Sequence, residues 1–443
     1  MRKFILIDPS ITELGGHYYE YAARVLDAAG RHGFEPVLGA NRGAGCLGAG
    51  PWRVVPAYRF GFFEPGPPRA LRWARRTAGV AFRRAHGRQA DAGIESGTGW
   101  ANAWSSMCFG RKRRAFFADS ARFFRAVPLN AGDLVFLPTV AEADMLGLAD
   151  LFRADRNTTE ATWHLLFRRD VPQANPGLAR SRRHFEQFAS RSSGRQVFFY
   201  TDTEPLTAEY NRLGRVSFCT LPIPIANSDR PPGGEIGRGG GLRHVVYLGD
   251  ARTEKGYHWL PRLVSDAKAA GLPVRFTFQS NFNVPGGEPA AAEARAELAS
   301  LPTDFGVTLL TEPLSSQGYL RLLLAADVVV IPYDAAAYKA RSSGVFAEAL
   351  AAGKPVIVPE GTWMAGELRR AGGESGVIYR DARELAGHLA RIVCDYDHYR
   401  AAAHDYSRTW SHYHSPDTLL RQLAARSAYF GSPTGLAAHA ILI

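Results

Sequence analysis

Residues 328–358 hold groups suited to binding a phosphate, together with the elements that would position them. The apolar run 328–332 predicts a strand buried on both faces. The helix that follows is expected to begin at small and hydroxylated residues: Ser342, Ser343, Gly344 and Val345. Free backbone N–H groups at such a helix start hold a phosphate, and Glu348, one turn on, can accept hydrogen bonds from sugar hydroxyls. Beyond the carboxyl end of a parallel strand, this pattern predicts a nucleotide-sugar site.

A basic motif lies upstream in residues 244–258, which read HVVYLGDARTEKGYH. The order is an apolar strand, a glycine turn, a charged stretch and a helix. Arg252 brings a planar fork of N–H donors and Lys255 a compact positive charge, and both suit an anionic ligand. The alternative is a solvated loop between a strand and a helix.

The two motifs together resemble the donor-binding half of GT-B glycosyltransferases, in particular the family 4 type. The family pattern Glu-Ala-x-Ala-x-Gly-x-Pro-Val-Ile is matched at Glu348, Ala349, Gly353, Pro355, Val356 and Ile357. The pattern Gly-Arg-x-x-x-x-Lys-Gly is matched at Gly249, Lys255 and Gly256. Two positions depart from the family. Ala340 replaces a glutamate associated with the donor sugar, and Asp250 replaces the arginine.

The resemblance implies a site on the C-terminal half. Arg252 and Lys255 would neutralise the donor diphosphate, the amides of residues 342–345 would share that role, and Glu348 would bind the ribose. It also implies a metal-independent and retaining transfer, with the nucleotide-diphosphate sugar as donor substrate and no further cofactor. The alternative for residues 342–353 is a generic helix that ends at a glycine.

The N-terminal half opens with a strand, a glycine-rich loop and a helix, as acceptor domains of GT-B enzymes do. Gly15 and Gly16 let the backbone approach a ligand closely, and we assign Gly16 to the ligand-binding residues as part of the donor set. We name His17, at the helix start, and His164, in residues 158–170, as the catalytic candidates. The alternatives are a helix cap or surface residue for His17, and a hydrogen-bonded core histidine beside Trp163 for His164.

The predicted fold class is α/β, with two Rossmann-like domains facing across a cleft. Strands and helices alternate along the second half, which predicts a mostly parallel sheet. The Pro- and Gly-rich stretch 227–241 reads as a linker. We therefore expect an acceptor domain at 1–226 and a nucleotide-sugar domain at 242–415. The segment 416–443 is expected to cross back to the first domain.

Composition points to a cytoplasmic protein. The four cysteines are scattered, without a CxxC pair, which argues for a reducing compartment and against a disulfide framework or structural zinc. The first residues, MRKFILIDPS, read as a strand rather than a secretory signal. No apolar run approaches the roughly 20 residues that span a bilayer.

Positive charge is concentrated between residues 53 and 125, where fifteen Arg or Lys face four Asp or Glu among many aromatics. Residues 69–88 read as a basic amphipathic helix and 111–126 look similar, which suits an anionic membrane surface and a lipid-linked acceptor. The protein would then be peripheral at the inner face of the membrane. A solvated basic face is the alternative. No nucleic-acid-binding module accompanies the charge, so nucleic acid is not an expected partner.

Three functions remain open on the sequence. The first is a glycosyltransferase that uses a nucleotide-sugar donor and a sugar or lipid-linked saccharide acceptor, as in polysaccharide synthesis. The second is a sugar-nucleotide epimerase, which shares the architecture. The third is a non-catalytic membrane- or nucleic-acid-binding protein with a degenerate glycosyltransferase fold, an interpretation that Ala340 and Asp250 favour.

Overall fold

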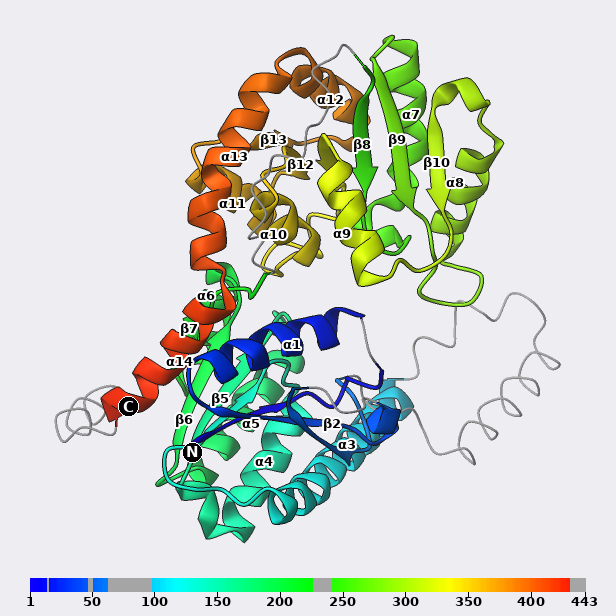
Figure 1. The fold of residues 1–443 in the computed structure, drawn as a ribbon. Helices are drawn as coiled ribbons and strands as arrows, with labels where there is room; N and C mark the ends of the chain where they lie inside the picture. Colours follow the sequence, from blue (N-terminus) through cyan, green and yellow to red (C-terminus); the bar gives the residue numbers. More distant parts are fainter. Residues whose placement is uncertain (14–15, 47–50, 63–97, 226–240, 431–443) are drawn as a thin grey trace, which may run out of the picture.

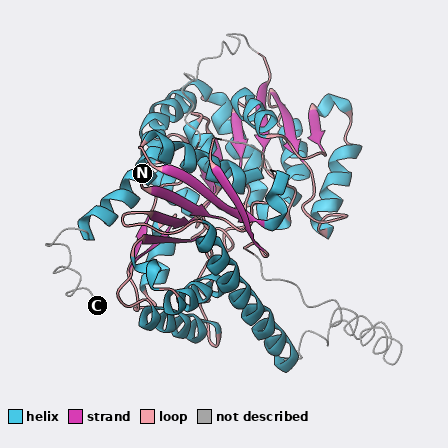
Figure 2. Ribbon diagram, turned by 60° about the horizontal axis from the view of Figure 1, so that its bottom comes forward, coloured by secondary structure: helices cyan, strands magenta, loops and turns pink. Residues whose placement is uncertain are grey.

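The structure is a computed structural model that describes residues 1–13, 16–46, 51–62, 98–225 and 241–430. It has two parallel sheets, one in each half of the chain (Figure 1). In Figure 2 the strands form the middle of each half and the helices lie outside them. The prediction of two Rossmann-like α/β domains is confirmed. The basic segment 69–88 lies outside the described residues, as does all of the predicted linker except Gly241.

The first sheet has seven strands in the order β3-β2-β1-β4-β5-β6-β7. Its strands are β1 (Lys3–Ile7), β2 (Glu35–Asn41), β3 (Arg53–Tyr58), β4 (Leu134–Leu137), β5 (Thr162–Phe167), β6 (Gln196–Thr201) and β7 (Phe218–Thr220). Its helices are α1 (Gly16–Arg31), α3 (Thr98–Ala126), α4 (Glu142–Ala154), α5 (Gly177–Arg191) and α6 (Glu204–Asn211). The central strands β1, β4 and β5 are buried along their whole length, as expected when helices cover both faces.

The second sheet has six strands in the order β10-β9-β8-β11-β12-β13. Its strands are β8 (Arg243–Tyr247), β9 (Val274–Gln279), β10 (Val307–Leu310), β11 (Val328–Val330), β12 (Val356–Pro359) and β13 (Gly376–Tyr379). The helices of this half are α7 (Leu260–Ala269), α8 (Pro289–Ser300), α9 (Ser316–Ala325), α10 (Gly344–Ala351), α11 (Trp363–Arg370), α12 (Leu385–Cys394) and α13 (Tyr396–Tyr413). The alternation expected from the sequence is confirmed element by element.

Each sheet reverses its strand order at one place. The first does so between β1 and β4, and the second between β8 and β11. In open parallel sheets the loops at the carboxyl ends of such strands form the ligand-binding crevice. In Figure 1 the arrowheads of β8 and β9 point toward the first half of the chain. The loops after β8 and β11 therefore face the first domain.

The last described helix, α14 (Pro416–Phe430), packs on the first half of the chain. Figure 1 shows α13 descending from the second sheet and α14 continuing along the first. Leu419, Leu420 and Leu423 are buried in the same core cluster as residues of β1 and α1. Arg31 of α1 also pairs with Asp417 at 2.9 Å. The segment 221–225 also contacts the second half, because Ile225 N donates to the carbonyl oxygen of His414 at 3.0 Å.

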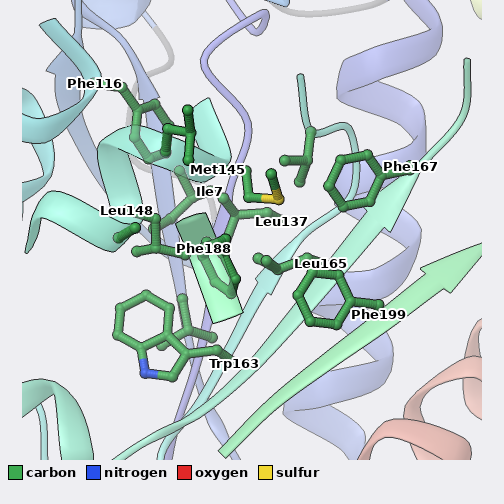
Figure 3. Close-up of a cluster of buried hydrophobic side chains, with 14 of the residues drawn as sticks. Ile7, Phe116, Leu137, Met145, Leu148, Trp163, Leu165, Phe167, Phe188 and Phe199 are labelled. Carbon is green, nitrogen blue, oxygen red and sulfur yellow. The ribbon is translucent and has the colours of Figure 1, made fainter. Parts of the chain in front are cut away.

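Aromatic and aliphatic side chains pack together in the core of the first domain (Figure 3). Phe116, Phe123 and Phe124 of α3 belong to this core. Their neighbour Lys112 is buried against Asp144 at 3.1 Å. Phe116, Phe123 and Phe124 therefore contact the protein interior, and binding of this segment to a membrane stays a prediction. Among the described residues, no helix combines the length and apolar character needed to cross a bilayer.

Candidate active site between the two sheets

The loop after β8 requires its glycines for steric reasons. Gly249 has a φ of +99°, and a Cβ there would lie 2.9 Å from Lys255 Nζ. Gly256 has a φ of +69°, and a Cβ there would lie 1.7 Å from the carbonyl oxygen of Pro332. Since Pro332 follows β11, Gly256 lets the two loops at the switch point touch. The backbone bond from Asp334 N to Glu254 O, 2.9 Å, joins the same loops.

Asp250 binds both cations of this loop. Its carboxylate is ion-paired with Lys255 Nζ at 2.5 Å and with Arg252 Nε at 2.9 Å. Burial works against ionisation of Asp250, but Lys255 and Arg252 outweigh it and lower its pKa. Burial also lowers the pKa of Lys255, which Asp250 partly offsets. The residue that departs from the family pattern therefore holds the two predicted diphosphate ligands together.

The start of α10 lies where the sequence predicted it. Ser343 is the N-cap, and its Oγ accepts a hydrogen bond from Phe346 N at 3.2 Å. The N–H groups of Gly344 and Val345 come first in the helix, where intrahelical bonds leave them unsatisfied. Nothing lies within 4 Å of the place where a Cβ of Gly344 would be. Gly344, the first residue of the helix, is exposed.

Ser342 faces the first domain instead of the helix. Its Oγ donates to Asp202 Oδ2 at 2.6 Å, and Arg168 Nε donates to the same oxygen at 2.9 Å. The neighbouring Thr203 Oγ1 donates to the carbonyl oxygen of Ala340 at 2.5 Å. Ala340 itself is buried in the core cluster of the first domain. Ala340, which stands where the family has a glutamate, thus lies in the contact between the two halves of the chain.

Glu348 also reaches across the cleft. Its Oε1 is 3.2 Å from Nη1 and 3.3 Å from Nη2 of Arg24 in α1. The two side chains are about one quarter exposed, at 23% and 24%. The carboxylate expected to bind ribose is accessible, but it is engaged by the first domain.

The N-terminal candidates divide into those the structure describes and those it does not. Gly16 begins α1 with a φ of +73° and is exposed. Gly15 and the side chain of His17 lie outside the described part of the chain. The role of His17 therefore stays a prediction.

His164, the second catalytic candidate, lies inside β5. Its imidazole is fully buried, 3.0 Å from Tyr200 Oη and 3.1 Å from Ser427 Oγ of α14. Burial lowers its pKa to about 3, so the ring is neutral. These surroundings are those of the hydrogen-bonded core histidine considered as the alternative. A catalytic role for His164 stays a prediction.

Asp8 and Arg168 were missed, although each directly follows an apolar strand. Asp8 comes after β1, at the switch point, and burial raises its pKa to about 7. Arg168 follows β5 and pairs with Asp202, which follows β6. A polar residue just beyond a buried strand is the sequence signal that identifies them. No local signal marks Arg24, which lies within an amphipathic helix.

The sequence matches no protein-family model and no curated protein. Solved structures share the fold. A sucrose-phosphate synthase from Thermosynechococcus elongatus is 16% identical, with a TM-score of 0.58 over 98% of this chain and 100% of that one. An α,α-trehalose-phosphate synthase (UDP-forming) from Burkholderia vietnamiensis is 12% identical, with a TM-score of 0.62 over 98% and 99%. A structure described as trehalose-6-phosphate from E. coli bound with UDP-2-fluoro glucose is 11% identical, with a TM-score of 0.60 over 95% and 99%. The chain thus shares the two-domain GT-B fold of these structures, which match 95–98% of its length.

Proposed function

We propose that this protein is a glycosyltransferase that moves a sugar from a nucleotide-diphosphate sugar to an acceptor. One observation carries the proposal. At a single edge of the second sheet, the loops after β8 and β11 bring together a cation pair, an open helix N-terminus and the carboxylate of Glu348. These groups match a diphosphate and a ribose, and the first domain faces them across the cleft.

The leaving diphosphate gains negative charge as the glycosidic bond breaks. Arg252, Lys255 and the amides of Gly344 and Val345 would stabilise that charge by fixed positive groups, so the transfer needs no metal ion. In the resting protein Asp250 neutralises the cations and Arg24 holds Glu348. Donor binding therefore exchanges these internal ion pairs for contacts with diphosphate and ribose.

The acceptor would enter from the first domain, where Asp8 lies at the carboxyl end of β1. The family resemblance favours transfer with retention and a saccharide or lipid-linked acceptor. Binding to an anionic membrane surface at the cytoplasmic face is supported only by the basic composition of residues 53–125. Because one neighbour is described as bound with UDP-2-fluoro glucose, UDP-sugars are the first donors to try.

The test is a hydrolysis screen of UDP-, GDP- and ADP-sugars that detects released nucleotide diphosphate. We expect slow turnover of one donor, and its loss in Lys255→Ala and Glu348→Ala. Lys268→Ala is the matched control, because Lys268 pairs with Asp304 on the exposed surface of the same domain. The absence of both turnover and nucleotide binding, the latter measured by calorimetry, would overturn the proposal and favour the non-catalytic alternative.

A further inference from the structure

The three residues that precede Ser343, the N-cap of α10, all contact the first domain. We call them the lead-in segment. The carbonyl oxygen of Ala340 accepts a hydrogen bond from Thr203 Oγ1 at 2.5 Å. Ser342 Oγ donates to Asp202 Oδ2 at 2.6 Å. The chain therefore passes directly from contacts with the first domain into the helix start of the proposed donor site.

The lead-in segment has no backbone support from its own half. Among the backbone hydrogen bonds of the residues that the structure describes, none joins positions 340–342 to another part of the second half. The stretch just before it is held differently. Tyr338 N donates to Asp334 O at 3.0 Å, and Trp363 N donates to Tyr338 O at 3.2 Å. The last residues before α10 therefore depend on the first domain for their main-chain position.

The contact with the first domain is shielded from water. Ala340 is 2% exposed and belongs to a core cluster whose other buried members all come from the first domain. Thr203 is fully buried, and Asp202 is buried as well. A buried carbonyl group that loses its hydrogen-bond partner is destabilised. Removing the Thr203 hydroxyl should therefore loosen the lead-in segment.

Arg341 connects the lead-in segment to the loop after β8. Its Nη2 lies 3.4 Å from Glu254 Oε2, and Glu254 directly precedes Lys255 in the cation loop. Its Nε lies 3.7 Å from Asp170 Oδ2 of the first domain. Both elements of the proposed diphosphate site, the loop after β8 and the start of α10, are thus linked to the first domain through the same three residues.

We propose that Asp202 and Thr203 are positioning residues of the donor site. They hold the lead-in segment so that the amides of Gly344 and Val345 are fixed where the diphosphate binds. They act through the chain and not by contact with the ligand. A site that is ordered before its ligand arrives binds it more tightly, because less conformational freedom is lost on binding. The inference rests on the proposed function for the identity of the ligand, and it makes nucleotide affinity depend on the first domain.

Thr203→Val tests the positioning role, because valine keeps the shape of the side chain but lacks the hydroxyl. Thr158→Val is the matched control, since Thr158 is also fully buried in the first domain. Its Oγ1 donates to Asp155 O at 2.7 Å and accepts from Arg195 Nε at 3.1 Å, as Thr203 Oγ1 accepts from Leu206 N at 3.3 Å. Thr158 precedes β5, at the edge of the sheet opposite to the lead-in segment.

Calorimetry with UDP, GDP and ADP gives the first readout. Both variants should lower the melting temperature, since each removes a buried hydroxyl. Only Thr203→Val should bind the preferred nucleotide more weakly, by about tenfold. Thr203→Ser keeps the hydroxyl and should restore the affinity. Equal losses of affinity in Thr203→Val and Thr158→Val would show a general effect of stability and overturn the inference.

Hydrogen exchange, followed by mass spectrometry without any nucleotide, gives the second readout. We expect the amides of 341–346 to exchange about tenfold faster in Thr203→Val and at native rates in Thr158→Val. The same rates in both variants would overturn the inference. A native chain that binds no nucleotide would overturn the proposed function, whereas the exchange rates still decide whether the first domain holds this segment.

Ala340→Glu provides a second variant in case Thr203→Val does not fold. A carboxylate is strongly disfavoured in the core of the first domain, so the lead-in segment should be displaced. Each sheet has its own core cluster, so both domains should stay folded. We expect faster exchange at 341–346 and loss of nucleotide binding. Nucleotide affinity equal to that of the native chain would contradict the positioning role.

Discussion

Arg24 and Glu348 form an ion pair between the two domains, with Nη1 and Oε1 3.2 Å apart. Arg24 Nη1 also lies 3.4 Å from the carbonyl oxygen of Pro224, close to where the chain leaves the first domain. The arginine therefore connects α1, the end of the first domain and the predicted ribose carboxylate. Any ligand that binds the Glu348 carboxylate has to displace Arg24 from it or share the carboxylate with Arg24.

Replacing Arg24 by alanine should free Glu348 for a nucleotide. Partly exposed ion pairs contribute about 0.2–1 kcal/mol, so we expect up to about fivefold tighter binding of a nucleoside diphosphate and little loss of stability. Isothermal calorimetry with UDP, GDP and ADP measures this. Arg31→Ala is the matched control on the same helix, because Arg31 pairs with Asp417 away from the cleft. Weaker nucleotide binding in Arg24→Ala would show instead that Arg24 contacts the nucleotide.

Gly256 and Gly271 offer a matched pair for the packing of the two switch-point loops. Both have left-handed backbones, with φ of +69° and +63°. A Cβ at Gly271 has nothing within 4 Å, whereas one at Gly256 would collide with Pro332 O at 1.7 Å. Gly271→Ala should cost about 1 kcal/mol of unfolding free energy from the backbone alone. Gly256→Ala should cost at least twice that and abolish nucleotide binding. Equal losses of unfolding free energy in the two variants, measured by urea unfolding, would show that the loop around Gly256 relaxes freely.

Asp8 should make stability fall as pH rises. Burial raises its pKa from 3.8 to about 7, so between these values the unfolded chain loses the proton while the folded chain keeps it. The free energy of unfolding then decreases by up to about 1.4 kcal/mol per pH unit through this window. Asp8→Asn removes the effect, because the amide stays neutral and its oxygen still accepts from Ser10 N.

Urea unfolding at pH 4.5, 6 and 7.5 tests this expectation. The stability of Asp8→Asn relative to the native chain should increase steadily across the series. Asp27→Asn, on the exposed side of α1, controls for the general effect of removing a carboxylate. A difference that does not change with pH would contradict the assigned burial effect.

The donor half was predictable because its determinants are local. An apolar strand, a capping serine and a glycine stop define β11, α10 and β12, and each lies within a few residues of the others. Gly249 and Gly256 were found by spacing, although the contact that requires Gly256, with Pro332, is more than seventy residues away in the chain. Short-range patterns therefore carried the fold and the outline of the site.

The contacts across the cleft were not predictable, because they join residues far apart in the sequence. The bonds of Glu348 to Arg24 and of Ser342 to Asp202 depend on how the two domains are placed. The same reason explains why the burial of His164 was not predicted. Its apolar neighbours fit either a strand or a cleft loop, and only the packing of α14 over β5, through Ser427, distinguishes the two.

His164 supplies a test that separates stability from catalysis. Burial lowers its pKa to about 3, so below pH 6.5 the unfolded chain binds a proton that the folded chain refuses. The contribution of this residue to the free energy of unfolding is fully present above pH 6.5 and is lost as pH falls toward 3.

His164→Phe removes that dependence but leaves Tyr200 Oη and Ser427 Oγ without their shared partner. We expect it to be less stable by about 1–3 kcal/mol at pH 7, with the gap closing at lower pH. A purely structural role of His164 predicts unchanged donor hydrolysis per folded molecule, as in the exposed control His398→Phe. Loss of turnover with native stability would assign the imidazole a part in the reaction.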